Sequence, residues 1–376
     1  MWLNNLFLSN FRNFKRVDLE FSPLINIFWG NNGEGKTNLL EALYCLGQGN
    51  SFRVDSGDQL IKWGEENVYL KGEGIRGNKV FVYELFLNDE GSHIRKVNSH
   101  RVNLKDTRQW LWMVIFSPKD LELIGGSPYR RRNFLDTELS YFNFRYSYLK
   151  LLYKRILSQR NFLLSLGKKK DIRKDLESWD EQLVDKGSQI VKMRLEGLKE
   201  TESFFKEVYP RVAGKDLSAK LSYKSSFLNE PGPWISVKEI KEAFRRKLAE
   251  IREKEIERGI TLVGPHRDDF VIFIKGINLN LFGSRGEQRI AAFSLRLSEF
   301  FFVKSKDGEE PIVLLDDITS ELDPLRQKFL LNFIQNKTQI FITTTQPLLF
   351  KSLYSSEVNF YKIVEGEVRK EENGAR

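Results

Sequence analysis

The chain begins with alternating apolar and polar positions, a pattern typical of strands that bury one face. The alternation covers residues 3–8 and returns at 17–21 after a polar turn, which predicts two paired strands. A continuous apolar run at 25–29 predicts a buried strand, and leucines at helical spacing within 39–46 predict a helix directly after it. Residues 67–104 are typical of antiparallel hairpins. The first third of the chain is therefore expected to be α/β.

The pattern changes in the middle of the chain, where strand signals stop. Mixed-charge stretches with helical periodicity run from about 139 to 209, and a charged helix is predicted at 237–258 after a Pro- and Gly-containing break. Strand patterns return after residue 259. We therefore expect one α/β domain interrupted by a mainly helical insertion of about 140 residues. The predicted boundaries are 1–120, 121–258 and 259–376.

Composition narrows the class of protein. Hydrophobic residues make up 41% of the chain, which excludes an intrinsically disordered protein. The apolar runs fall short of the roughly 20 residues that span a bilayer, and polar residues interrupt the N-terminus before a signal-like segment can form. The single cysteine, Cys45, lies among predicted core positions and fits a reducing compartment. We expect a cytoplasmic protein without a membrane segment, and the formal charge of +9 favours a polyanionic partner.

One glycine-rich segment carries the strongest chemical signal. It matches G-x-x-x-x-G-K-[ST] between the buried strand and the helix, and its residues are Gly30, Asn31, Asn32, Gly33, Glu34, Gly35, Lys36 and Thr37. Such a P-loop points backbone N–H groups at phosphate oxygens, with Lys36 at the β- and γ-phosphates and Thr37 as a Mg²⁺ ligand. The alternative is an ordinary glycine-rich turn. The context favours a nucleoside triphosphate site.

Two adjacent acids follow a buried apolar strand late in the chain. The strand is 312–315, and the acids are Asp316 and Asp317. In a P-loop ATPase a carboxylate in this place holds Mg²⁺, so Asp316 is predicted to share the metal with Thr37. Asp317 is placed to polarise the attacking water, and Asp317, Asp316 and Lys36 are the predicted catalytic set. Without the P-loop, acids after an apolar strand are equally typical of a sheet edge.

A second anion-binding helix start is predicted at 284–289, where Ser-Arg-Gly-Glu-Gln-Arg precedes an apolar helix. It lies about 250 residues from the P-loop. Two phosphate-type sites in one chain make sense if the second closes over a nucleotide that another subunit holds. The alternative is a helix cap without a ligand.

Together these motifs resemble a known set. The P-loop, the S-x-G-E-Q loop at 284–288, the strand ending in two acids and the segment 320–323 resemble the Walker A, signature, Walker B and D-loop motifs of ABC-type ATPase heads. Segments 10–13, 117–136 and 264–269 narrow the resemblance to the RecF family of bacterial recombination proteins. The similarity runs in order along nearly the whole chain.

The resemblance implies an ABC-type P-loop head with a mixed central sheet and an antiparallel subdomain. It also implies ATP and Mg²⁺ as cofactors, an ATP-dependent homodimer, and binding to double-stranded and gapped DNA. Members act with RecO and RecR to place RecA on single-stranded gaps, in DNA repair, replication restart and the SOS response. Nucleotide contacts carried over beyond the P-loop are Arg12, Ser284, Gly286, Glu287, Gln288 and Asp323.

Two departures from the wider ABC pattern bear on catalysis. Asp317 stands where many ABC heads have Glu, and 343–346 reads Thr-Thr-Thr-Gln where transporters usually carry a switch His. A shorter carboxylate and a missing His suggest slow hydrolysis. We therefore expect a weak, DNA-stimulated ATPase whose main role is that of a nucleotide-switched DNA-binding protein. The sequence does not identify the Q-loop glutamine.

A basic stretch supports a DNA partner independently. Between residues 118 and 170 the chain has twelve Lys/Arg against four Asp/Glu, a net charge of +8. Binding by such a stretch would be sequence-independent and salt-dependent. For any one residue a solvated helix face remains an alternative, and Arg131 and Arg132 could instead pair with Asp136 or serve a dimer interface. The predicted DNA-binding residues are Arg130, Arg131, Arg132, Lys150, Lys154 and Arg155.

Two rival functions share the ATPase motifs. A nucleotide-binding subunit of a membrane transporter would lack this basic insertion and would usually carry the switch His. A chromosome-organising head normally needs a coiled-coil arm, for which the insertion is too short. The RecF-like function is the prediction, and the transporter subunit is the alternative.

Overall fold

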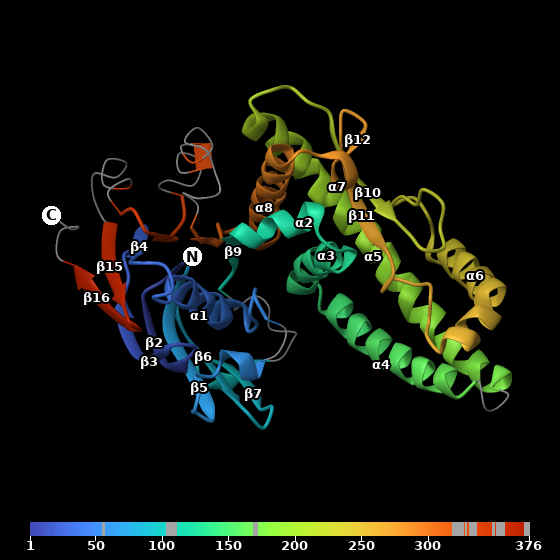
Figure 1. Cartoon of the computed structure of the whole chain (residues 1–376), viewed down its shortest axis with the longest axis horizontal. Helices are drawn as coiled ribbons and strands as arrows, with labels where there is room; N and C mark the ends of the chain where they lie inside the picture. The colour runs from blue at the N-terminus through green and yellow to red at the C-terminus, as the bar shows by residue number, and fades with distance from the viewer. Residues whose placement is uncertain are drawn as a thin grey trace. The chain divides into compact units, whose positions relative to one another are not determined.

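The computed structural model describes residues 1–54, 57–102, 111–167, 172–317, 327, 329–330, 337–347, 350 and 358–371. The chain divides into two compact units, Met1–Asp120 with Glu299–Arg376, and Leu121–Ser298. Figure 1 shows the first unit as strands gathered around α1, and the second as mostly long helices. The predicted α/β class with a mainly helical insertion is therefore confirmed.

The N-terminal strands of the first unit form an antiparallel sheet. Its order is β3-β2-β5-β6-β7-β8, and β1 also pairs with β5. In β3 the buried Val17 and Leu19 alternate with exposed Arg16 and Asp18, as the alternating pattern predicts. The strands are β1 (Trp2–Leu3), β2 (Asn5–Phe11), β3 (Phe14–Glu20), β5 (Asn67–Arg76), β6 (Lys79–Asn88), β7 (His93–Val97) and β8 (His100–Arg101).

A second, mainly parallel sheet carries the ends on which the site is built. Its order is β16-β15-β4-β14-β13-β9, and only the pairing of β15 with β16 is antiparallel. Because parallel strands end at the same edge, the residues that follow β4 and β13 come together. The strands are β4 (Ile25–Trp29), β9 (Met113–Phe116), β13 (Ile312–Leu315), β14 (Ile340–Thr344), β15 (Val358–Val364) and β16 (Glu367–Glu371).

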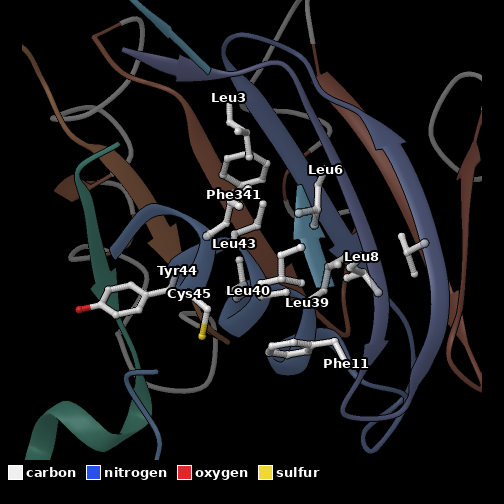
Figure 2. Packing of buried hydrophobic residues seen from close by; sticks show 14 of the residues in the cluster. Leu3, Leu6, Leu8, Phe11, Leu39, Leu40, Leu43, Tyr44, Cys45 and Phe341 are labelled. Carbon is white, nitrogen blue, oxygen red and sulfur yellow. The ribbon is translucent and has the colours of Figure 1, made fainter. Parts of the chain in front are cut away.

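Helix α1 (Lys36–Gln48) packs its apolar side chains against both sheets of this unit. Figure 2 shows Leu39 and Leu43 of α1 between Phe11 of β2 and Phe341 of β14. All four side chains are fully buried, and so is Cys45, whose thiol pKa is raised well above its usual value by burial. The prediction that Cys45 is a core residue is confirmed.

The second unit is a helical bundle with a small sheet. Strand β10 pairs antiparallel with β11, which pairs with β12, and this sheet shares a core with the helices. In the described part of the chain no helix combines the length and apolar character needed to cross a bilayer. The elements are α2 (Leu121–Gly125), α3 (Pro128–Phe142), α4 (Phe144–Leu166), α5 (Arg173–Ala213), β10 (Ala219–Lys224), α6 (Val237–Arg258), β11 (Asp269–Ile274), β12 (Ile277–Asn278), α7 (Leu279–Phe282) and the part of α8 (Arg285–Asp307) up to Ser298.

Two glycines allow the long helix α5 to pack closely in this bundle. A Cβ at Gly197 would clash with Leu139 of α3, and a Cβ at Gly187 would lie 2.8 Å from Phe244 Cε1 of α6. Either substitution would force these buried neighbouring side chains to shift.

The boundary after the insertion differs from the sequence prediction. The helical unit continues to Ser298, whereas the sequence suggests a return to the ATPase domain at residue 259. The physical reason is strand pairing, because β11 completes its sheet with β10 inside the insertion. Strand β10 itself was missed, although Ala219, Leu221 and Tyr223 are buried in the alternation that marks a strand.

Candidate nucleotide site and DNA-facing residues

The loop between β4 and α1 needs glycine at two positions. A Cβ at Gly30 would clash with the carbonyl oxygen of Ile363 in β15. Gly35 precedes α1 with a φ of 110°, and a Cβ there would lie 2.5 Å from the side-chain amide nitrogen of Asn13. Left-handed glycines turn successive N–H groups to one side, and α1 begins directly after them. This loop therefore has the backbone form of an anion site.

Lys36 is nearly buried at the start of α1. Its ammonium donates hydrogen bonds to the carbonyl oxygens of Gly30 at 2.8 Å and Asn31 at 2.7 Å. Burial lowers the pKa of Lys36, while the charges of Asp317 and Asp316 oppose that shift. The P-loop backbone thus surrounds the Lys36 ammonium. Phosphate oxygens could replace the two carbonyl oxygens as acceptors of its hydrogen bonds.

The predicted metal ligands Thr37 and Asp316 meet directly. The Thr37 hydroxyl donates to Oδ1 of Asp316 at 2.8 Å, and Thr343 at the end of β14 donates to the same oxygen at 2.8 Å. Burial raises the pKa of Asp316, although these two hydrogen bonds oppose the rise. The Asp317 amide donates to the Thr343 hydroxyl at 2.9 Å, with Asp317 in left-handed backbone at φ 46°. The sequence pattern marked Thr343 only as standing where transporters usually carry a switch His, and it did not predict these contacts with both acids.

The donor set fits Mg²⁺ held together with phosphate. Within the described residues, no three His, Cys, Asp or Glu side chains gather to hold a metal ion by themselves. Mg²⁺ in nucleotide sites is typically bound by one or two carboxylates plus substrate phosphates and waters. One buried carboxylate and one hydroxyl, on Asp316 and Thr37, match that requirement.

Arg12, which is predicted to contact the nucleotide, pairs with an acidic residue of α1 in this structure. Its guanidinium makes a two-pronged contact with the buried carboxylate of Glu41 on α1, at 3.0 and 2.9 Å. Arg53 reaches the same carboxylate at 3.2 Å, and Ser51 donates to it at 2.5 Å. In this structure Arg12 therefore orders α1 next to the P-loop. Sequence reasoning missed Glu41, an acid at a core-facing helical position.

The predicted signature residues form the first turn of α8. The Ser284 hydroxyl accepts from the Glu287 amide at 3.3 Å, and the Glu287 carboxylate accepts from the Ser284 amide at 2.9 Å, so the two form a capping box. The Gln288 side chain donates to the Leu279 carbonyl at 3.2 Å. A Cβ at Gly286 would meet open space. The exposed turn is thus preformed, while Asp323 lies outside the described residues.

The predicted DNA-binding residues differ in how much of each side chain is exposed. Arg131 is buried, which corrects its prediction as a DNA contact. That side chain is 4% exposed, bonds Asp269 through both Nε and Nη2, and donates to the carbonyl oxygens of Ile124 and Gly126. Arg132 is half-buried and donates to the Asp268 carbonyl at 2.7 Å. Arg131 therefore has no free surface for a phosphate, and neither arginine pairs with Asp136 as the alternative suggested.

The remaining predicted residues present more surface. Arg130 pairs with Glu122 at 3.0 Å and Lys150 with Asp136 at 3.3 Å, and both side chains are about two-fifths exposed. Lys154 and Arg155 are exposed on α4. Helix α4 contains no Asp or Glu among its residues, so its exposed face is cationic. Lys154 and Arg155 are the strongest remaining candidates for phosphate contact.

The motif at 264–269 lies in a buried polar cluster of the helical unit. The Asp268 carboxylate accepts from the Tyr223 hydroxyl at 2.8 Å, and burial raises the pKa of Asp268. His266 shares a 2.8 Å hydrogen bond with Tyr153, and burial lowers the pKa of His266 to about 4. Arg194, which sequence reasoning missed, donates to the Pro265 carbonyl at 2.5 Å. Most of this motif therefore has a structural role in the described chain.

Known proteins are similar in sequence to this chain over nearly its whole length. The family model "RecF/RecN/SMC N terminal domain" matches residues 2–368. The chain is 37% identical over 373 residues to the DNA replication and repair protein RecF of Heliobacterium modesticaldum, covering 98% of this chain and 99% of the relative. It is 36% identical over 368 residues to RecF of Clostridium tetani, with 98% and 99% covered.

Solved structures of RecF are also similar to this chain. One described as the recombination mediator protein RecF with ATP in the RecFOR pathway aligns with a TM-score of 0.88 at 32% identity, covering 99% of this chain and 98% of that chain. An Smc head domain from Pyrococcus furiosus aligns with a TM-score of 0.52 at 15% identity, which indicates a shared fold. The motifs, the fold and the full-length similarity together place the chain in the RecF family.

Proposed function

We propose that this chain is an ATP-dependent DNA-binding protein of recombinational repair and replication restart. One observation carries the proposal: Lys36, Thr37 and Asp316 come together where the P-loop meets the end of β13. Family membership supports ATP as the nucleotide, because a solved relative at 32% identity is described with ATP. Membership of the RecF family also argues against the transporter subunit.

The site residues divide the work of nucleotide binding. Lys36 would leave the carbonyls of its own loop to contact the β- and γ-phosphates. Thr37 and Asp316 would hold Mg²⁺, which supplies charge neutralisation at the phosphates when it is bound. Asp317 follows directly in the chain and is the proposed group that orients the attacking water. Hydrolysis is proposed to be slow and to reset the protein.

The signature turn is proposed to act on the nucleotide of a second copy. Ser284 and Glu287 form a capping box at the N-terminus of α8. The open space beside Gly286 leaves room for a phosphate to approach the backbone closely. A helix start favours an anion. ATP would therefore join two protomers, with Ser284, Gly286, Glu287 and Gln288 of each facing the P-loop of the other. Asp323 is proposed to join the same interface.

Double-stranded and gapped DNA are the proposed nucleic-acid partners. The cationic face of α4, with Lys154 and Arg155 exposed, supports phosphate neutralisation. Lys150 and Arg130 are proposed to contribute less, because each has an acidic partner. RecO and RecR are the proposed protein partners, through which the chain promotes loading of RecA.

Titration calorimetry with MgATP tests the nucleotide site. Lys36→Met is expected to abolish binding, whereas Lys154→Met, an exposed lysine on α4, is expected to bind as wild type does. Equal binding by wild type and Lys36→Met would overturn the proposed site.

Light scattering with and without MgATP tests the dimer. Ser284→Arg is expected to keep ATP binding and to lose the ATP-dependent rise in mass. A dimer of unchanged stability in this variant would rule out the proposed role of the signature turn.

A further inference from the structure

Trp63 is an unusually exposed tryptophan in the first unit. It is 98% exposed, although tryptophan side chains are among the more buried in folded proteins. A large aromatic face in water is a platform for another flat apolar group. Trp234, 81% exposed in the helical unit, offers a matched comparison.

The backbone that carries Trp63 is firmly held. Trp63 and Gly64 are the central residues of a turn closed by the hydrogen bond from the Glu65 amide to the Lys62 carbonyl at 3.0 Å. Gly64 has a φ of 87°, the left-handed conformation that such a turn needs at this position. The Lys62 amide donates to the Asn10 carbonyl at 2.8 Å. The turn is therefore fixed to the end of β2.

Two further contacts connect this turn to the P-loop. The Lys62 ammonium donates to the Asn13 carbonyl at 2.9 Å. The Asn13 side chain in turn donates to the Glu34 carbonyl of the P-loop at 3.0 Å and lies against Gly35. Asn13 is thus a bridge between the residue before Trp63 and the loop that would hold phosphates.

Trp29 also lies beside the P-loop, but one face of its ring is already covered. Trp29 ends β4 directly before Gly30, but the Lys362 ammonium lies over its ring at 4.8 Å from the centroid. That cation–π contact occupies a face that a base would need. Trp63 has nearly its whole surface available.

We propose that Trp63 is the platform on which the purine base of the bound nucleotide stacks. The inference rests on the proposed ATP site, since the phosphates must lie in the P-loop for the base to reach this turn. Lys36 and Thr37 can account for recognition of the phosphates, and Trp63 adds the aromatic contact for the base. Stacking is tolerant of base identity, so Trp63 contributes affinity for nucleoside triphosphates more than selection between purines.

Tryptophan fluorescence during MgATP titration is the direct test. Wild type and Trp234→Phe are expected to show a saturable change in emission as the base covers Trp63. Trp63→Phe is expected to lose most of that change while it still binds MgATP by calorimetry. An undiminished change in Trp63→Phe would overturn the proposal.

Affinity for two ligands separates stacking from damage to the loop. Trp63→Ala is expected to bind MgATP roughly tenfold more weakly, and Trp63→Phe close to wild type. Tripolyphosphate has no base, so wild type and Trp63→Ala should bind it equally. Equal loss for both ligands, or no loss for MgATP, would contradict the stacking role. Lys36→Met should bind neither MgATP nor tripolyphosphate if the P-loop is the phosphate site. If this variant binds both ligands as wild type does, the proposed nucleotide site itself is wrong, and the stacking role of Trp63 falls with it.

Discussion

Thr37 and Asp316 are 279 residues apart in the chain and share a 2.8 Å hydrogen bond from hydroxyl to carboxylate. Parallel pairing brings them together, because β13 and β4 both pair with β14 and end at the same edge. The bond joins the P-loop helix to the two acids at the end of β13. The two proposed metal ligands are therefore in direct contact.

Replacing Asp316 with Asn should stabilise the apo protein at neutral pH while weakening MgATP binding. Burial raises the folded-state pKa of Asp316 above its usual value of 3.8, so the folded state favours the protonated acid. Its stability contribution consequently falls as the pH rises from 3.8 through the folded pKa. Thermal unfolding should give Asp316→Asn a higher midpoint than wild type at pH 7.5, with the difference shrinking near pH 4. A lower midpoint at pH 7.5 would contradict the burial argument.

Lys154→Gln with Arg155→Gln should weaken DNA binding without changing stability. Both side chains are exposed on α4, and surface substitutions are usually neutral within about 0.5 kcal/mol. Each lost phosphate contact lowers the slope of log affinity against log salt by about 0.9. Fluorescence anisotropy over a salt series measures that slope, with Lys238→Gln as the control for an exposed lysine elsewhere in the unit. An unchanged slope would remove α4 from the DNA surface.

Arg131→Gln should have the opposite effect: it should lower stability and leave DNA binding unchanged. The substitution leaves Asp269 and several carbonyl groups without their buried partner, which costs about 3–5 kcal/mol. Chemical denaturation should show this loss. At temperatures where the variant is folded, its DNA salt slope should equal that of wild type. A stable variant with a reduced slope would restore Arg131 as a phosphate contact.

His266 should make the protein less stable as the pH falls below 6.5. Burial lowers its folded pKa to about 4 from an ordinary value of 6.5, so the unfolded chain binds the extra proton in this interval. Stability therefore rises with pH between 4 and 6.5, and the loss at pH 5 is about 2 kcal/mol relative to neutral pH. Comparing wild type with His266→Gln from pH 7.5 to 4.5 isolates this contribution. Parallel pH profiles for the two proteins would contradict it.

Short sequence patterns predicted the strand, loop and helix of the P-loop correctly. The motif from Gly30 to Thr37 requires a strand before it and a helix after it, and both are present. Helix α6 begins after Ser236 and ends before Gly259, signals that are readable in the sequence. Such features depend on residues close together in the chain, which is why the sequence was sufficient for them.

Distant partners explain what the sequence could not predict. Arg131 and Lys154 look equally basic in the sequence, but Arg131 meets Asp269, 138 residues later, inside the helical unit. Arg12 likewise pairs with Glu41, 29 residues later, a contact that the sequence pattern did not reveal. Burial and pairing depend on tertiary contacts, so a count of charges overstates the DNA surface.

The most direct test of the nucleotide-switched DNA-binding function is anisotropy of labelled gapped and fully duplex DNA. Wild type and Lys36→Met are titrated with and without MgATP at two salt concentrations. The account predicts tight binding that requires both MgATP and Lys36, and that weakens as salt rises. Equal binding by Lys36→Met in MgATP, or no binding by wild type under any condition, would contradict it.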